Sequence, residues 1–397
     1  MSRTQNPSIR FCGFSNTWEQ RKAKEVFIAT ADKGHPELPV LSATQDRGMI
    51  KRDENNINIF HEKKNEEGYK RVVPGQFVIH LRSFQGGFSH SAIEGITSPA
   101  YTIFGFQEPD NHDDNYWKYV FTSKEFIRQL ETVTYGIRDG RSISYDEFLT
   151  MSFLFPKKEE QAQIAVYLDT ITDLIILHQC KYEKLQDIKA SMLDKMFPKN
   201  GEDVPEVRFK GFTGAWKYKK FSELYDSVSQ KNDLTYGVDK NITVATMQYR
   251  PEIKVTDIEY LKTYNVFKMG DIAFEGHQSK EFRYGRFVEN DIGDGIISHI
   301  FVVFRPKIDY DLKFWKYAIN YERLMRPILA CCTKASTMMN DLVAKDFLDE
   351  SILVPSIEEQ RKIGTALAEI DNLILLQQQE LSKLQSIKKA LLEKMFV

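Results

Sequence analysis

The sequence is poor in cysteine, and its few cysteines do not form a metal-binding pattern. There are four of them, Cys12, Cys180, Cys331 and Cys332. A zinc site needs pairs of ligands at short regular spacing, and a disulfide framework needs more cysteines for a chain of this length. We therefore expect reduced thiols and no structural metal.

Long apolar runs and a basic domain are also missing. No apolar run reaches the roughly 18 residues of a membrane span, and the start, MSRTQNPSIRF, lacks the apolar core of a secretory signal. The net charge is -2, with 19 basic against 20 acidic residues in 1–155 and 22 against 23 in 201–354. We expect a cytoplasmic protein that does not contact membranes and does not bind nucleic acid non-specifically through a basic face.

Catalytic motifs are absent as well. The sequence has no G-x-x-x-x-G-K-[ST] phosphate loop, no G-x-G-x-x-G cofactor loop, no N-P-P-[YF] motif and no histidine pair at metal spacing. Asp271, Glu275 and Lys280 are residue types found in nuclease sites, but their spacing is wrong. We interpret them as a strand end followed by a polar loop, and we predict a non-enzyme with no cofactor or metal of its own.

What the sequence does contain is a long internal repeat. Residues 156–197 return 199 positions later, at 355–396, with 20 of 42 positions identical and no gap. IRFCGFSNTW (9–18) returns as VRFKGFTGAW (207–216), and YWKY (116–119) returns as FWKY (314–317). The predicted organisation is a first domain at 1–155, a first repeat helix at 156–198, a second domain at 199–354 and a second repeat helix at 355–397.

Each repeated segment predicts a long helix with one apolar seam. A proline and two glutamates stand at its start, and apolar residues follow at steps of three and four. The seam is interrupted by His178 and Lys189 in the first copy and by the equivalent residues Gln377 and Lys388 in the second. A seam about 50 Å long must be buried, and the other copy is the simplest partner. We predict an antiparallel coiled coil with a pseudo-two-fold axis.

The segments between the helices predict two similar α+β domains with mostly antiparallel strands. Short β-rich runs bounded by Gly, Pro or Asp occur at 75–84, 96–106, 270–276 and 297–306. One helix per domain is expected, at 116–133 and 314–329.

The repeated motifs resemble those of one family. The P-x-x-E-E-Q starts, the K-L-Q-x-I-K and L-x-K-M-F endings, the R-F-x-G-F-x-x-x-W segments and the G-D-I at Gly270 together resemble the specificity subunit of type I restriction-modification systems. The first half departs from the G-D-I pattern with Gly75, Gln76 and Phe77.

The resemblance implies a DNA-recognition role. In the family, each target recognition domain reads one half of a split, asymmetric double-stranded DNA site, and the paired helices set the spacing. Two modification subunits dock on the helices and methylate adenine, and restriction subunits translocate DNA. S-adenosylmethionine, ATP and Mg would be bound by those partners. The alternative is a non-catalytic scaffold with two peptide- or protein-binding domains.

Candidate DNA-reading residues lie in loops where basic and amide side chains cluster with aromatic residues. Arginine can bind guanine with two hydrogen bonds, and glutamine can do so with adenine. The candidates are Arg82, Gln85, His90, Arg138 and Arg141 in the first half, and Gln278, Lys280, Arg283, Tyr284, Arg286, Lys334 and Ser336 in the second. For any one of them the alternative is a solvated loop side chain.

Overall fold

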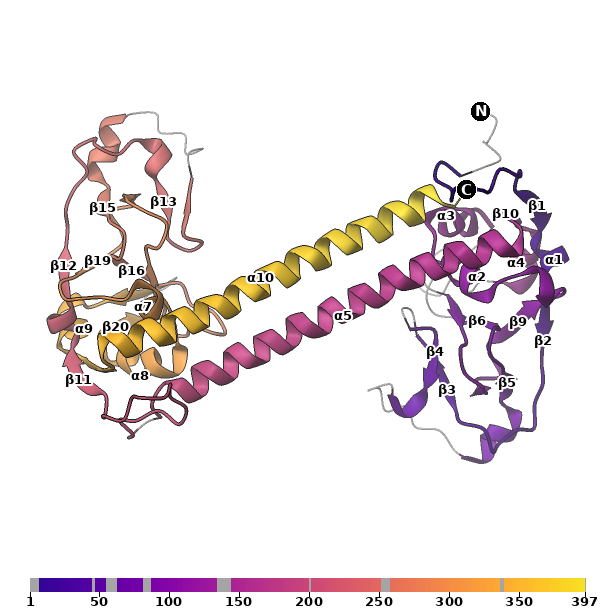
Figure 1. Ribbon diagram of the computed structural model, residues 1–397, viewed down its shortest axis with the longest axis horizontal. Coiled ribbons are helices and arrows are strands. Elements are labelled where there is room, and N and C mark those ends of the chain that lie inside the picture. The colour runs from indigo at the N-terminus through magenta and orange to yellow at the C-terminus, as the bar shows by residue number, and fades with distance from the viewer. Residues whose placement is uncertain are drawn as a thin grey trace. The chain divides into compact units, whose positions relative to one another are not determined.

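The chain divides into two compact units, each assembled from distant parts of the sequence. The computed structural model describes residues 7–44, 47–54, 63–80, 87–133, 144–199, 201–250, 258–335 and 339–396. The first unit combines Met1–Gln179 with Gln379–Val397, and the second is Cys180–Gln378. Each unit therefore contains one α+β domain, the start of one long helix and the end of the other (Figure 1).

The first unit is built on a four-stranded antiparallel sheet in the order β2-β9-β6-β7. Its central strand β6 is buried along its whole length, as expected for an apolar run. Phe27 of β2 contacts Phe104, Trp117 and Phe148, so strands and helices share one aromatic core. The strands are β1 (Glu19–Lys22), β2 (Phe27–Thr30), β3 (Leu41–Ala43), β4 (Met49–Lys51), β5 (Lys70–Val72), β6 (Phe77–Ile79), β7 (Phe88–His90), β8 (Gly95–Thr97), β9 (Thr102–Phe106) and β10 (Ser152–Phe155). The helices are α1 (Ala23–Val26), α2 (Asp114–Val120), α3 (Lys124–Val133) and α4 (Tyr145–Thr150), with 3₁₀ turns at Arg52–Glu54, Lys63–Gly68 and Pro109–Asn111.

The second unit repeats this topology. Its four-stranded sheet has the order β12-β19-β16-β17. The first and last strands of the unit, β11 and β22, form a separate pair, just as β1 and β10 do in the first unit. The strands are β11 (Lys217–Lys220), β12 (Tyr225–Val228), β13 (Ile242–Thr243), β14 (Gln248–Tyr249), β15 (Asn265–Phe267), β16 (Ile272–Glu275), β17 (Arg286–Glu289), β18 (Gly295–Ile297), β19 (Val303–Pro306), β20 (Thr333–Ala335), β21 (Asn340–Leu342) and β22 (Ser351–Val354). The helices are α6 (Phe221–Leu224), α7 (Leu312–Ala318), α8 (Glu322–Cys332) and α9 (Ala344–Asp349), with 3₁₀ turns at Val238–Lys240 and Ile258–Thr263. The predicted α+β class with mostly antiparallel strands is confirmed.

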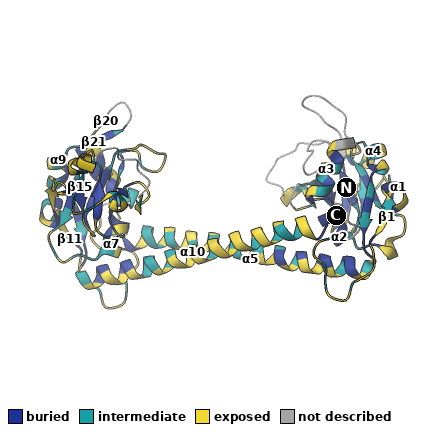
Figure 2. Cartoon of the chain, turned by 90° about the horizontal axis from the view of Figure 1, so that it is seen from above, coloured by how far each residue is buried: buried dark blue, intermediate teal, exposed yellow. Residues whose placement is uncertain are grey.

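The two repeated segments form the long helices α5 (Lys158–Met196) and α10 (Ile357–Lys394). The start of α5 and the end of α10 belong to the core of the first unit, where Ile164 and Leu168 are buried together with Met395. In the second unit the core holds the end of α5 and the start of α10, including Met196 and Leu367. The helices therefore run antiparallel within each unit, as predicted. Figure 2 shows buried residues at the helix ends and intermediate or exposed residues between them.

The prediction of one helix per domain at 116–133 and at 314–329 is wrong, because two short helices occur in each of these segments. In the first unit α2 ends at Val120, and the Ser123 hydroxyl accepts a hydrogen bond from the Phe126 amide at the start of α3. A serine in this position satisfies the free amides of a new helix start and so favours a break. In the second unit α7 and α8 are separated at the same place, between Ala318 and Glu322. Among the described residues, no helix is long and apolar enough to cross a membrane.

Candidate nucleic-acid interface

In the second unit, the predicted reading residues gather on two neighbouring loops. One is the 276–285 loop between β16 and β17, and the other is the β20–β21 hairpin. Asn340 joins them: its backbone amide donates to the Gly276 carbonyl at 2.8 Å, and its side-chain amide donates to the Arg283 carbonyl at 3.1 Å. A Cβ at Gly276 would lie 2.1 Å from the Asn340 carbonyl oxygen, so this approach needs glycine.

The candidates on these loops differ in their exposure to solvent and in the contacts that their side chains make. Gln278, Lys280, Arg283 and Lys334 are exposed. The Gln278 amide donates to Asn340 at 3.1 Å, and the Arg283 guanidinium lies 5.7 Å from the Tyr284 ring centre. The exposed set presents the kind of donors that bind base edges and phosphates.

Arg286 is different, because its guanidinium is already bound within the unit. It donates to Glu275 at 2.7 Å and to the Ala245 carbonyl at 2.8 Å, and it lies over the Phe282 ring. These contacts make Arg286 a support for the 276–285 loop. Whether it also contacts DNA stays a prediction.

In the first unit, only His90 of the predicted readers can be placed. Its Nε2 lies 2.6 Å from Asp114 Oδ2, and its ring lies against Phe77. This contact holds the pKa of Asp114 below its usual value. Arg82, Gln85, Arg138 and Arg141, together with Ser336 of the second unit, lie outside the described residues.

The sequence motifs at the start of each half are explained by a buried ion pair that motif analysis missed. Arg10 donates from Nε and Nη2 to the two carboxylate oxygens of Glu160, at 2.8 and 2.7 Å. Arg208 binds Glu359 in the same way and at the same distances. Because Glu160 and Glu359 are each 2% exposed, the pairs fix the segment before each domain to the first turn of the helix that follows it. The only signal in the sequence was that both motifs recur at nearly the same offset.

The lysines that interrupt the helix seams also have a structural role. Lys388 of α10 lies over the Tyr119 ring in the first unit, 5.6 Å from its centre. Lys189 of α5 lies over the Tyr317 ring in the second, at 5.3 Å. Each lysine thus contacts the YWKY-type motif of the unit in which its helix ends.

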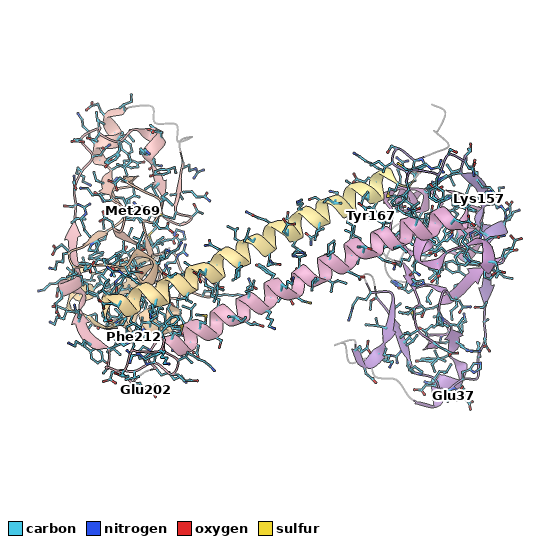
Figure 3. The ribbon with its side chains drawn as sticks, in the orientation of Figure 1. Glu37, Lys157, Tyr167, Glu202, Phe212 and Met269 are labelled. Carbon is cyan, nitrogen blue, oxygen red and sulfur yellow. The ribbon has the colours of Figure 1, made fainter. Side chains whose placement is uncertain are left out.

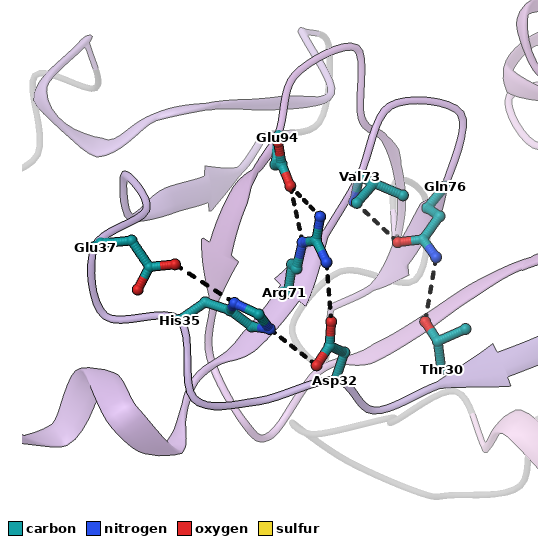
Figure 4. Close-up of polar contacts among 8 residues, drawn as sticks. All are labelled: Thr30, Asp32, His35, Glu37, Arg71, Val73, Gln76 and Glu94. Atoms are coloured by element: carbon teal, nitrogen blue, oxygen red, sulfur yellow. Dashed lines mark hydrogen bonds and ion pairs between the residues drawn. The ribbon is translucent and has the colours of Figure 1, made fainter.

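Two clusters of ionisable side chains form hydrogen bonds within their own unit. Arg71 donates to Glu94 and Asp32, and His35 lies between Asp32 and Glu37 (Figure 4). The hydrogen bond from His35, supported by Arg71, lowers the pKa of Asp32. In this cluster Arg71 already has its anionic partners and is a poor candidate for a phosphate contact.

The second cluster is buried in the second unit. The Tyr310 hydroxyl donates to Glu289, and the hydroxyls of Tyr310 and Tyr225 are 2.8 Å apart. Burial raises the pKa of Glu289 to about 9, so its carboxyl group is neutral near pH 7.

The residues with a nuclease-like composition do not form a catalytic site. Asp271 is fully buried and bound by Arg305 at 2.9 and 2.8 Å, while Glu275 is bound by Arg286. Lys280 is exposed on the loop. Within the described part of the chain, no group of three or more His, Cys, Asp or Glu side chains is placed to hold a metal ion.

Comparison with known proteins finds similarity to specificity subunits of type I restriction-modification systems. Residues 214–386 match the type I restriction modification DNA specificity domain family. The type I restriction enzyme MjaVIII specificity subunit of Methanocaldococcus jannaschii is 25% identical over 309 residues, covering 70% of this chain and 68% of that protein. The crystal structure of the S subunit of a type I restriction-modification system from M. genitalium has a TM-score of 0.59 at 14% identity and covers 99% of both chains. That of the HsdS subunit from Thermoanaerobacter tengcongensis has a TM-score of 0.48 at 15% identity and covers 96% of both.

Proposed function

We infer that the chain belongs to the specificity subunits of type I restriction-modification systems and is the non-catalytic DNA-recognition component of such a complex. The observation that carries this conclusion is the match of residues 214–386 to the DNA specificity domain. The first unit has the same strand order as the matched unit, so both halves have a recognition-type fold.

A two-part, asymmetric DNA site is supported by units that share a fold but not their side chains. His90 ends β7 opposite Phe77, and Glu289 ends β17 opposite Ile272, so a histidine and a buried acid occupy the same ladder position. In the second unit the reading surface is formed by Gln278, Lys280, Arg283 and Lys334. Because loops decide which bases are contacted, two such different units should read two different half-sites.

Docking of two modification subunits is supported by equivalent apolar patches on the long helices. The first helix patch consists of Leu174, Ile176 and Leu177, and the second of Leu373, Leu375 and Leu376. Their exposed fractions lie between 38% and 56%. Exposed apolar groups on a helix indicate a partner surface. Each residue of the first patch lies 199 positions before its equivalent in the second patch. The two patches should therefore bind two copies of the same partner.

The remaining chemistry is assigned to the partners. S-adenosylmethionine would be bound by the modification subunits, and ATP and Mg by the restriction and translocation subunits. This chain would contact double-stranded DNA in the cytoplasm and carry no cofactor. Its contribution is to position the methyltransferases at the recognised sequence.

The proposal is tested by selecting DNA from a random library with the chain assembled with its modification subunits. We expect enrichment of two short motifs separated by a fixed gap. Arg283→Ala should relax one motif only, at a cost of about 1–3 kcal/mol if Arg283 reads a base. Failure to enrich any motif, combined with binding of peptides or proteins by the isolated chain, would instead support the scaffold alternative.

A further inference from the structure

The first unit contains an open cavity lined by basic and neutral donor groups. Its volume is about 480 Å³, and all its lining residues belong to this unit. It is bounded by the ends of β4 and β7, by α2 and by both long helices. The polar lining consists of Arg47, His90, Asn115, Lys118, Tyr119, Thr122, Thr172 and Lys388, and apolar side chains such as Phe88 and Phe121 complete the wall. We call it the Lys388 cavity.

Two ammonium groups in this cavity lie over one aromatic ring, and one of them is paired with a carboxylate. Lys118 Nζ lies 5.0 Å and Lys388 Nζ 5.6 Å from the centre of the Tyr119 ring. The carboxylate of Asp169 accepts hydrogen bonds from Lys118 and from the Tyr119 hydroxyl, both at 2.6 Å. Within the described residues Lys388 has no ion-pair partner. Burial, together with the charge of Lys118, lowers its pKa, so an additional anion would relieve an unfavourable charge.

The second unit shows the same arrangement with the charge neutralised. Lys189, the repeat equivalent of Lys388, lies over Tyr317 and forms an ion pair with Asp371 at 2.7 Å. The residue equivalent to Asp371 in the first repeat is Thr172, which lines the Lys388 cavity without a charge. The repeats also differ at Ala368, whose equivalent in the first repeat is Asp169, and Asp169 is paired with Lys118. Within the described residues, Lys388 therefore lacks the ion-pair partner that Lys189 has.

We propose that the Lys388 cavity binds a phosphate group and that, given the proposed function, this group is a backbone phosphodiester of the recognised DNA. Lysine ammonium groups bind phosphate as point charges, and the side-chain amide of Asn115 offers a neutral donor beside them. The cavity includes His90, whose strand β7 begins at Phe88, close in sequence to the predicted readers Arg82 and Gln85. The first unit then holds the DNA backbone through a contact that the second unit lacks and that does not depend on base sequence.

The test compares charge variants of the chain in its complex with the modification subunits. Lys388→Met, and independently Thr172→Asp, should lower the slope of log affinity against log salt by about one unit, because one phosphate contact is lost. Both should weaken binding to all DNA sequences by the same factor. Lys388→Arg should keep the wild-type slope. Lys189→Met is the matched control in the second unit and should also leave the slope unchanged.

The outcomes separate this inference from the proposed function on which it rests. Sequence-selective DNA binding with an unchanged slope in Lys388→Met and Thr172→Asp would overturn the inference and leave the function standing. Loss of all selectivity in the wild-type complex would remove the function itself. Thermal unfolding of the free chain in inorganic phosphate or chloride at equal ionic strength gives a second readout. Protection by phosphate that depends on Lys388, without any change in the DNA slope, would assign the cavity to a small phosphate compound and overturn the DNA contact.

Discussion

At the scale of single residues, the same position in the two sheets has been given opposite chemistry. His90 is held by an ionised aspartate at the end of β7, whereas Glu289 is buried at the end of β17 beside Tyr310. Among the described residues, Glu289 Oε1 has no hydrogen-bond partner, and the residue is only 2% exposed. A neutral carboxyl group tolerates such a site far better than a carboxylate does.

This burial predicts a specific dependence of stability on pH. The pKa of Glu289 is about 9 in the folded chain, above its ordinary value near 4.5, so the folded state retains a proton that the unfolded state loses. The stabilisation is complete below about pH 4.5 and is lost as the pH rises towards about 9, by up to about 1.4 kcal/mol per pH unit. Glu289→Gln, which keeps an acceptor for Tyr310, should flatten this decline in urea unfolding at pH 5, 7 and 9.

The exposed Glu202, labelled in Figure 3, is the matched control in the same unit. Glu202→Gln should reproduce the wild-type profile. If Glu289→Gln also followed the wild-type profile, Glu289 would be ionised in the folded chain and the burial argument would be wrong.

At the scale of elements, the first turn of each long helix is fixed to its domain by a buried ion pair. Removing one partner of such a pair leaves a buried, uncompensated charge. Arg208→Met should therefore destabilise the second unit by about 3–5 kcal/mol, because the Glu359 carboxylate would be left buried. Hydrogen exchange should rise in the first turns of α10 and in β11, while the first unit stays protected.

The repeat supplies the control for this prediction. Arg10→Met should have the same effect in the first unit, on the first turns of α5 and on β1. Replacing Glu359 together with Arg208 by apolar residues should restore most of the lost protection. Equal loosening of both units by either single variant would show that the pairs do not act locally.

The elements also show what could be predicted from the sequence and what could not. The long helices and their pairing followed from periodicity, because an apolar seam repeated at steps of three and four needs a partner. The Arg10–Glu160 pair did not, since the two residues are 150 positions apart and neither motif names its partner. Lys388 was predicted only as an interruption of the seam; its contact with Tyr119 depends on a different segment of the chain.

At the scale of the whole molecule, each long helix starts in the core of one unit and ends in the core of the other. The chain crosses between the units twice, once at Gln179 and once at Gln378. A change in the length of one helix must therefore be matched by the other. This requirement makes the proposed spacing role of the helices testable without altering either core.

Inserting seven helical residues after Gln179 and seven after Gln378 should lengthen both helices by about 10 Å and keep their buried faces in phase. At about 3.4 Å per base pair, the gap between the two DNA motifs should grow by about three base pairs, while the motifs themselves stay the same. Selection from a random DNA library measures both quantities. The same insertion after Gln179 alone should abolish selection of the two motifs together, because α5 would no longer match α10. An unchanged gap with full affinity in the double insertion would show that the helices do not set the spacing.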